Sequence, residues 1–309
     1  LGRREEMGKD EFGNDTYSYS APLFLTDKEF TSYTEIANLE TENNWEEGAT
    51  SANGVSVNGI YPSDNGNLLV LYNKYFEDWS DEDNYVYEQS WALETVGPDG
   101  QTVSSFDINI SDPDSDYLYI SDVCPLGNGK LFVLTDMKAY IVNPDGSVEK
   151  ECDVAENIAN AQYLSDGRII VFYYDENWNY CYGEYNTSTG EFAEYAKLSN
   201  SMNGNPIVTD DGRLFVSDST ELIEYELETG EEKGVEVNWL NSDINPNFLY
   251  NLTYMDGDFY NIDSSEWQNP RLMKYTPCDD VIEKYVINLA CLYFVKVRNK
   301  IDDAVSKDA

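Results

Sequence analysis

Three tryptophan-bearing segments hold the residues whose types best suit molecular recognition. They are Lys74–Asn84, Asp175–Tyr180 and Ser264–Asn269, and each sets aromatic rings beside carboxylates or amides. An exposed ring can stack on the apolar face of a sugar while Asp and Asn bind its hydroxyl groups, and Trp and Tyr also anchor protein interfaces. The candidate ligand-binding residues are Tyr75, Phe76, Trp79, Trp178, Tyr180 and Trp267. The structural alternative is that these rings pack against neighbouring strands and support the loops.

A second candidate is a cation site in the segment where Asp112, Asp114 and Asp116 alternate. Calcium requires several oxygen ligands, and this spacing can supply three carboxylates from one loop. Pro113 stiffens the segment, and the glycine and distal glutamate of an EF-hand loop are absent. With 59 acidic residues in the chain, such spacing also arises by chance. We therefore expect no cofactor, with calcium at these three carboxylates as the alternative.

The composition argues against several classes of function. The net charge of −40 repels phosphate backbones and anionic membrane surfaces, so we expect no nucleic-acid binding. The absence of histidine excludes Ser-His-Asp and Cys-His catalysis and removes the commonest zinc ligand. The five cysteines include no CxxC pair, so we expect most of them, Cys124 included, to be packed strand residues. The chain contains no run of about 18 apolar residues, which is the length that a helix needs to span a membrane.

The elements that must position these residues follow a turn–glycine–strand repeat. A glycine-marked turn precedes an apolar strand at Gly66, Gly129, Gly167, Gly212 and Gly257, and the last four glycines are separated by 38, 45 and 45 residues. A second glycine-marked turn follows in four of the repeats, at Gly100, Gly146, Gly190 and Gly230. Two hairpin turns in each period of roughly 40–50 residues indicate four-stranded antiparallel blades of a β-propeller.

We therefore predict an all-β fold, a β-propeller with five clear blades. The blades are expected at 54–110, 117–155, 158–200, 204–240 and 248–290, and a sixth blade or a closing strand from residues 17–50 stays open. Two further strands are expected near Ala21–Leu25 and Phe30–Ala37. Residues 1–20 are predicted to form a polar tether, 21–285 the propeller, and 286–309 a strand–helix stub that opens a second domain or forms a C-terminal helix. The tryptophan segments would then be loops on the face that usually carries ligand sites in propellers.

Two stretches near the C-terminus carry a resemblance to a known family. The phrase Asn238–Ile244 is followed by Ile287–Ser306, which passes from an apolar strand into a basic amphipathic helix. This layout resembles the surface lipoproteins of Gram-positive gut bacteria in which a propeller precedes the solute-binding domain of an ABC importer. The resemblance implies an extracellular or cell-surface protein, lipid-anchored at full length, from which this chain is truncated before the solute-binding domain. It implies no catalytic residues.

The sequence thus predicts a non-enzymatic recognition or scaffold propeller, acting as a monomer, that binds a glycan or a partner protein domain in nutrient uptake. The alternative is a carboxylate-dependent glycoside hydrolase or lyase, which would need two carboxyl groups about 5–10 Å apart at the channel mouth. A third interpretation is a purely structural propeller whose tryptophans are buried.

Overall fold

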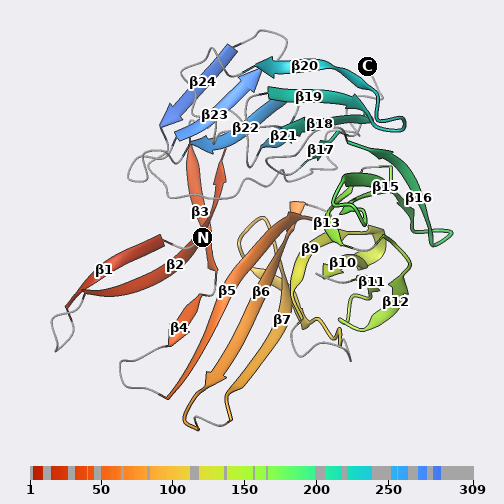
Figure 1. Ribbon diagram of the computed structural model, residues 1–309. Helices are drawn as coiled ribbons and strands as arrows, with labels where there is room; N and C mark the ends of the chain where they lie inside the picture. Colours follow the sequence, from red (N-terminus) through yellow and green to blue (C-terminus); the bar gives the residue numbers. More distant parts are fainter. Residues whose placement is uncertain are drawn as a thin grey trace, which may run out of the picture. The chain divides into compact units, whose positions relative to one another are not determined.

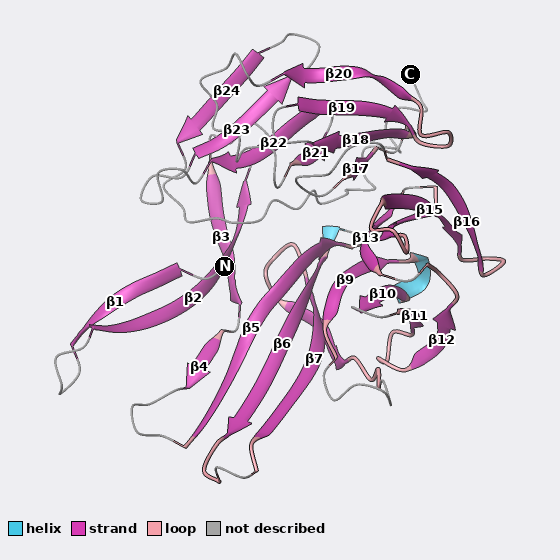
Figure 2. Cartoon of the chain, viewed as in Figure 1, coloured by secondary structure: helices cyan, strands magenta, loops and turns pink. Residues whose placement is uncertain are grey.

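A computed structural model describes most of the chain as β-structure. The described residues are 3–9, 15–26, 32–39, 41–44, 50–63, 66–81, 84–111, 118–135, 138–155, 157–164, 166–198, 206–209, 211–217, 221–238, 252–255, 257–263, 271–276 and 281–286. Within them, helix is limited to short 3-10 turns such as Gly127–Gly129, and strands joined by turns and loops make up the rest (Figure 2). No described helix has the length and apolar character needed to cross a membrane.

Five consecutive antiparallel sheets, each a simple meander, form the blades (Figure 1). Blade 1 consists of β5 (Ser51–Pro62), β6 (Leu68–Asp78), β7 (Val86–Val96) and β8 (Thr102–Asp107), with β4 (Glu42–Asn44) as a fifth strand beside β5. Blade 2 consists of β9 (Ile120–Pro125), β10 (Leu131–Thr135), β11 (Ala139–Val142) and β12 (Val148–Cys152). Blade 3 consists of β13 (Ile158–Tyr163), β14 (Ile169–Tyr174), β15 (Tyr180–Asn186) and β16 (Glu191–Lys197).

Blade 4 consists of β17 (Ile207–Val208), β18 (Arg213–Ser217), β19 (Glu221–Glu226) and β20 (Glu232–Asn238). Blade 5 consists of β21 (Thr253–Met255), β22 (Asp258–Asp263), β23 (Arg271–Thr276) and β24 (Val281–Val286). The predicted all-β propeller with five four-stranded blades is therefore confirmed. The predicted strand–helix stub lies outside the described residues beyond Val286, as does most of the phrase that follows Asn238.

The N-terminal region differs from the predicted tether, because it forms strands. β1 (Arg3–Lys9), β2 (Asp15–Thr26) and β3 (Tyr33–Leu39) make a three-stranded antiparallel sheet. The two strands expected at 21–25 and 30–37 correspond to parts of β2 and β3. The rest was missed because Arg3–Lys9 is mostly charged and lacks an apolar alternation. Tyr17 and Tyr19, however, alternate with serines at the period of a strand.

The described chain divides into two compact units, and each has its own apolar packing. The first contains the described residues up to Tyr119 together with Val142–Glu149. In it, residues of β2 and β3 pack on one face of blade 1, in a cluster of Ala21, Leu39, Val70, Tyr72, Ala92 and Val96. The second unit contains Ile120–Ile141 and the described residues from Lys150 onward.

In the second unit, the middle strands of the blades are buried on both faces. Ile169 and Val171 of β14 join a cluster with Phe132 of blade 2. The alternating residues of the same strand, Ile170 and Phe172, join a cluster with residues of blade 4. All five of these side chains are inaccessible to solvent or nearly so. A strand covered on both sides needs apolar residues at every position, which explains the unbroken run Ile-Ile-Val-Phe.

Polar side chains join neighbouring blades where the apolar packing ends. The carboxamide of Gln162 in β13 donates to the backbone carbonyl of Pro206 and accepts, at 2.7 Å, from the backbone N–H of Val208 in β17. It thus pairs with the next blade as a strand backbone would. The Tyr182 hydroxyl of β15 donates to the Leu227 carbonyl of blade 4 at 2.7 Å, and burial raises its pKa to about 12. These bonds fix how blades 3 and 4 are paired.

The second glycine of each repeat lies against the outermost strand of the preceding blade. A Cβ atom at Gly146 would come 2.0 Å from the carbonyl oxygen of Asp107 in β8, and one at Gly230 would come 2.4 Å from the Cβ of Ala196 in β16. A Cβ atom at Gly100 would likewise come 1.8 Å from the carbonyl oxygen of Ile36 in β3. β3 therefore lies against the second turn of blade 1, just as β8 lies against that of blade 2 and β16 against that of blade 4.

We predict that Gly146→Ala will lower the free energy of unfolding far more than Gly212→Ala. Both glycines have a positive φ, of 81° and 84°, so each alanine costs about 1–2 kcal/mol in backbone strain. Only Gly146 also meets backbone atoms, whereas a Cβ at Gly212 has no neighbour within 4 Å. Urea unfolding measures the difference, and equal losses in the two variants would contradict the close approach.

Candidate functional site

The turn between β14 and β15, residues Asp175–Asn179, is the most sharply defined surface feature among the described residues. The Asp175 carboxylate accepts hydrogen bonds from the backbone N–H groups of Asn177 and Asn179, both at 2.8 Å. The side-chain amide of Asn179 donates to both carboxylate oxygens of Asp175, at 2.9 and 2.7 Å. Two backbone bonds also close the turn: the Asp175 N–H donates to the Asn179 carbonyl, and the Trp178 N–H donates to the Asp175 carbonyl, both at 2.9 Å. The loop is therefore rigid before any ligand arrives.

These bonds lower the pKa of Asp175. The largest cause is the hydrogen bond from the Asn179 side chain, followed by the bond from its backbone N–H. The charged carboxylate is thus the form that holds the turn. The same physical logic applies to Asp78 and Asp145, whose pKa values are lowered by hydrogen bonds from Ser80 and Ser147.

Trp178 lies at the tip of this turn in an unusual backbone conformation. Its φ is 60°, and the other described non-glycine residues with a positive φ are Asn128 and Asn157. Asparagine tolerates this region, but a bulky residue there costs of order 1–3 kcal/mol. The side chain does not recover that cost by burial, because 76% of it is exposed.

The Trp178 indole is supported from below by a ladder of aromatic rings. Its centroid lies 5.9 Å from that of Tyr174, which in turn lies 5.0 Å from Tyr180. The Tyr180 ring stacks on Phe172 in the core between blades 3 and 4. The exposed tryptophan is therefore connected through two tyrosines to the rigid interior of the blade.

Tyr180 was predicted to contact ligand from a loop, and the structure places it elsewhere. It is the first residue of β15, only 7% of it is exposed, and burial raises the pKa of its hydroxyl. Its register opposite Tyr174 draws it into the sheet. Tyr180 therefore supports the turn and has little surface to offer a ligand.

The predicted loop of blade 1 is shorter than the sequence suggested. Tyr75 and Phe76 lie in β6, which continues to Asp78 and pairs with β5 and β7 along its whole length. They point to opposite faces of the sheet, as successive strand residues must. Trp79 follows directly, half-buried, and its backbone N–H donates to Thr50 at 2.8 Å. The loop prediction failed because the segment carries the charged residues Lys74, Glu77 and Asp78, although β5 and β7 pair with it on both sides.

The remaining predicted site residues lie outside the described residues. These are Trp267 and the three carboxylates of the calcium prediction, Asp112, Asp114 and Asp116. Trp79 and Trp178 belong to different units. Their predicted location on one face with Trp267 thus stays a prediction, as does calcium binding. Within the described segments, no group of three or more Cys, Asp or Glu side chains is arranged to hold a metal.

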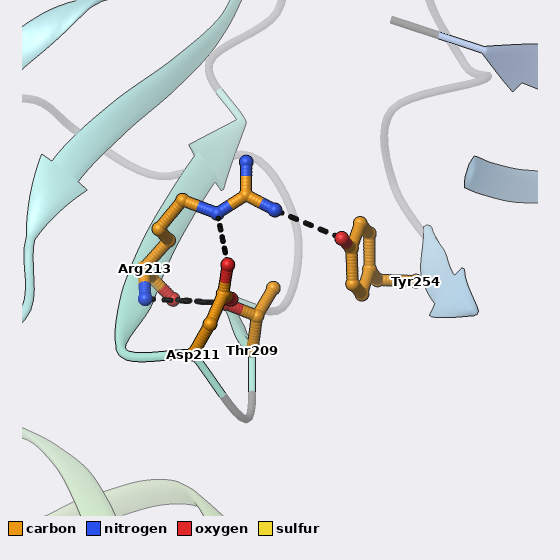
Figure 3. A network of polar contacts seen from close by, with 4 residues as sticks. All are labelled: Thr209, Asp211, Arg213 and Tyr254. Carbon is orange, nitrogen blue, oxygen red and sulfur yellow. Dashed lines mark hydrogen bonds and ion pairs between the residues drawn. The ribbon is translucent and has the colours of Figure 1, made fainter. Parts of the chain in front are cut away.

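Polar side chains of blades 4 and 5 bond to one another and join the two blades (Figure 3). Asp211 accepts a short hydrogen bond from the Thr209 hydroxyl and one from Arg213 Nε at 3.1 Å, and its pKa is lowered. Arg213 Nη2 donates to the Tyr254 hydroxyl at 2.8 Å, which joins the turn of blade 4 to β21. A general acid in a glycosidase needs a raised carboxyl pKa, the opposite of what this network produces.

The described cysteines are packed in the interior, as predicted. Cys124, Cys152 and Cys181 are all free thiols and buried. Burial raises the pKa of each thiol, most strongly for Cys124. A thiol that resists ionisation is a poor nucleophile, so none of the three has the character of a catalytic cysteine.

No protein-family model and no curated protein matches this sequence. Similar solved structures include a protein of unknown function from Bacteroides caccae, with TM-score 0.45 and 12% identity over 76% of this chain and 81% of that one. TolB from Acinetobacter baumannii has TM-score 0.47 and 12% identity, over 87% of this chain and 61% of TolB. A candidate 6-phosphogluconolactonase from Bacteroides fragilis has TM-score 0.43 and 12% identity, over 92% and 93%. With all three TM-scores below 0.5, the fold assignment rests on the repeated sheets of this chain.

We predict that Trp178→Asn will keep the free energy of unfolding or raise it by up to about 1 kcal/mol. Asparagine suits a positive φ, so the substitution relieves strain that an exposed indole does not repay. Chemical denaturation of the two proteins measures the change. A loss above about 1.5 kcal/mol would contradict this account, because it would mean that the ring contact with Tyr174 holds the turn together.

We predict that the gap in stability between the wild type and Asp175→Asn will stay constant from pH 6 to about 5 and will narrow as the pH falls below about 4 toward 3. The pKa of Asp175 is lower in the folded protein than the value of about 3.9 expected for an unfolded chain. Its contribution is therefore complete above that value and is lost as the pH falls through the folded pKa. Urea midpoints across this range test the point, and a gap independent of pH would refute it.

Proposed function

We propose that this chain is a non-enzymatic recognition propeller that binds a glycan through the turn carrying Trp178. The observation that carries the proposal is the exposed, strained indole on a turn that is already rigid. Folding alone would favour asparagine or glycine at this position. A tryptophan kept there at a cost to stability is best explained by a contact made outside the chain.

The arrangement suits a ligand that presents a flat apolar face bordered by polar groups. Trp178 offers an aromatic surface held by Tyr174, and Asn177 beside it is exposed. Pyranose rings have this character, since their C–H faces stack on aromatics and their hydroxyl groups bond to amides. Because the turn is preorganised, little conformational entropy is lost on binding.

A partner protein domain is the competing ligand, because an exposed tryptophan can also anchor a protein interface. An extracellular location on a lipid-anchored nutrient-uptake protein is part of the proposal. It is supported by the resemblance at Asn238–Ile244 and Ile287–Ser306. The lowered carboxyl pKa values and the buried thiols support the non-enzymatic part.

The test is a glycan-array screen of the wild type and of Trp178→Ala, run with and without calcium. We expect selective binding that falls at least about tenfold in the variant, as for an anchoring residue at an interface. The matched control is Val103→Ala, which removes another exposed apolar side chain from β8 of the first unit.

A triple variant, Trp79→Ala/Trp178→Ala/Trp267→Ala, shows whether the three tryptophan segments act together. Calcium dependence would direct attention to Asp112, Asp114 and Asp116. If no glycan binds, or if the folded Trp178→Ala protein binds as the wild type does, the glycan proposal is wrong. Partner-domain docking would then take its place.

A further inference from the structure

We infer that the Trp178 turn selects neutral glycans and rejects acidic glycans of the same size. The inference rests on the proposed function and names the chemical class of the ligand at the same site. Two observations carry it: two exposed asparagines lie in or next to the turn, and the charged groups of the turn and of the strands that flank it are mainly negative.

Two exposed asparagines lie in or next to the turn, and their carboxamides are candidates to bond a ligand. Asn177 precedes Trp178, and its backbone N–H is the group that bonds Asp175. Asn157 adjoins the turn through its backbone carbonyl, which accepts from the N–H of Tyr174 at 3.1 Å. Both residues are exposed, and within the described residues no contact engages either carboxamide. A carboxamide both donates and accepts, which matches a sugar hydroxyl.

The charges at this end of blade 3 disfavour an anion. Asp175 and exposed Glu176 lie in the turn itself, and Glu194 of β16 interacts with Tyr173 and Cys181 just below it. The cation described nearby is Lys197, which acts on Asp175 and Cys181. Three carboxylates against one ammonium group leave a negative potential, in a chain whose net charge is already −40. Like-charge contacts of this kind are a common way to exclude a wrong ligand.

Glu176 is the residue on which the selectivity can be tested. It is exposed and lies two positions before the indole, and the bonds that hold the turn come from Asp175 instead. The substitution Glu176→Gln removes one negative charge and leaves those bonds in place. Glu191 provides a matched control. It is exposed, it is the first residue of β16, and it pairs with Asn186 at the far end of β15. The seven residues from Tyr180 to Asn186 span roughly 20 Å, about twice the screening length at 0.1 M salt.

The experiment compares the neutral glycan with the highest affinity on the array with the same glycan oxidised at C6 to a uronate. Calorimetry gives both dissociation constants at about 100 and about 500 mM NaCl for the wild type, Glu176→Gln and Glu191→Gln. For the wild type at low salt we expect the uronate to bind about tenfold or more weakly than the neutral form. High salt should narrow the difference between the two dissociation constants. It should strengthen the binding of the uronate alone, because screening weakens its repulsion by the carboxylates.

Glu176→Gln should strengthen uronate binding severalfold at low salt and leave neutral binding within about twofold, whereas Glu191→Gln should change neither. Equal or tighter binding of the uronate, with loss in Trp178→Ala, would overturn the inference and leave the proposed function standing. If neither glycan depends on Trp178, the proposed function itself fails, and the inference fails with it.

Discussion

Burial of the middle strands on both faces is the constraint on which the rest of the second unit depends. In β14 successive residues enter the clusters shared with blades 2 and 4, so both faces of the sheet are covered by other blades. Hydrophobic burial of this kind is the dominant favourable term in folding. It also means that the sheet faces cannot bind a ligand. The recognition proposed above would therefore use a turn at a blade end, where the rigid stack supplies a fixed platform.

The polar contacts of the same unit follow from that stack. Backbone groups at the rim of an apolar interface must find partners, and Gln162 and Tyr182 supply them between blades 3 and 4. Arg213 does the same between blades 4 and 5 through Tyr254 (Figure 3). Gln162, Tyr182 and Arg213 are thus engaged in joining blades.

The blade order could be predicted from the sequence because its determinants are local. Hairpin turns need positive φ, and glycines such as Gly146 and Gly212 mark them directly in the sequence. The site was harder, because its determinants depend on pairing. Tyr180 looks like a loop residue until its register opposite Tyr174 is known. The turn geometry was signalled in the sequence by the spacing of Asp175 and Asn179. An aspartate can accept hydrogen bonds from residues that follow it closely, and its side chain then closes the loop.

Trp178 departs from this agreement between local sequence and fold. Every other described residue with a positive φ is a glycine or an asparagine, the types that tolerate it. Sequences that fold well satisfy local and global preferences together, and exceptions are expected where a residue has another task. The aromatic ladder down to Phe172 explains how the exception survives, because the core fixes Tyr180, Tyr180 contacts Tyr174, and Tyr174 contacts the indole. A surface residue that is both strained and rigidly supported has the properties of a binding anchor, since its position is set before the ligand arrives.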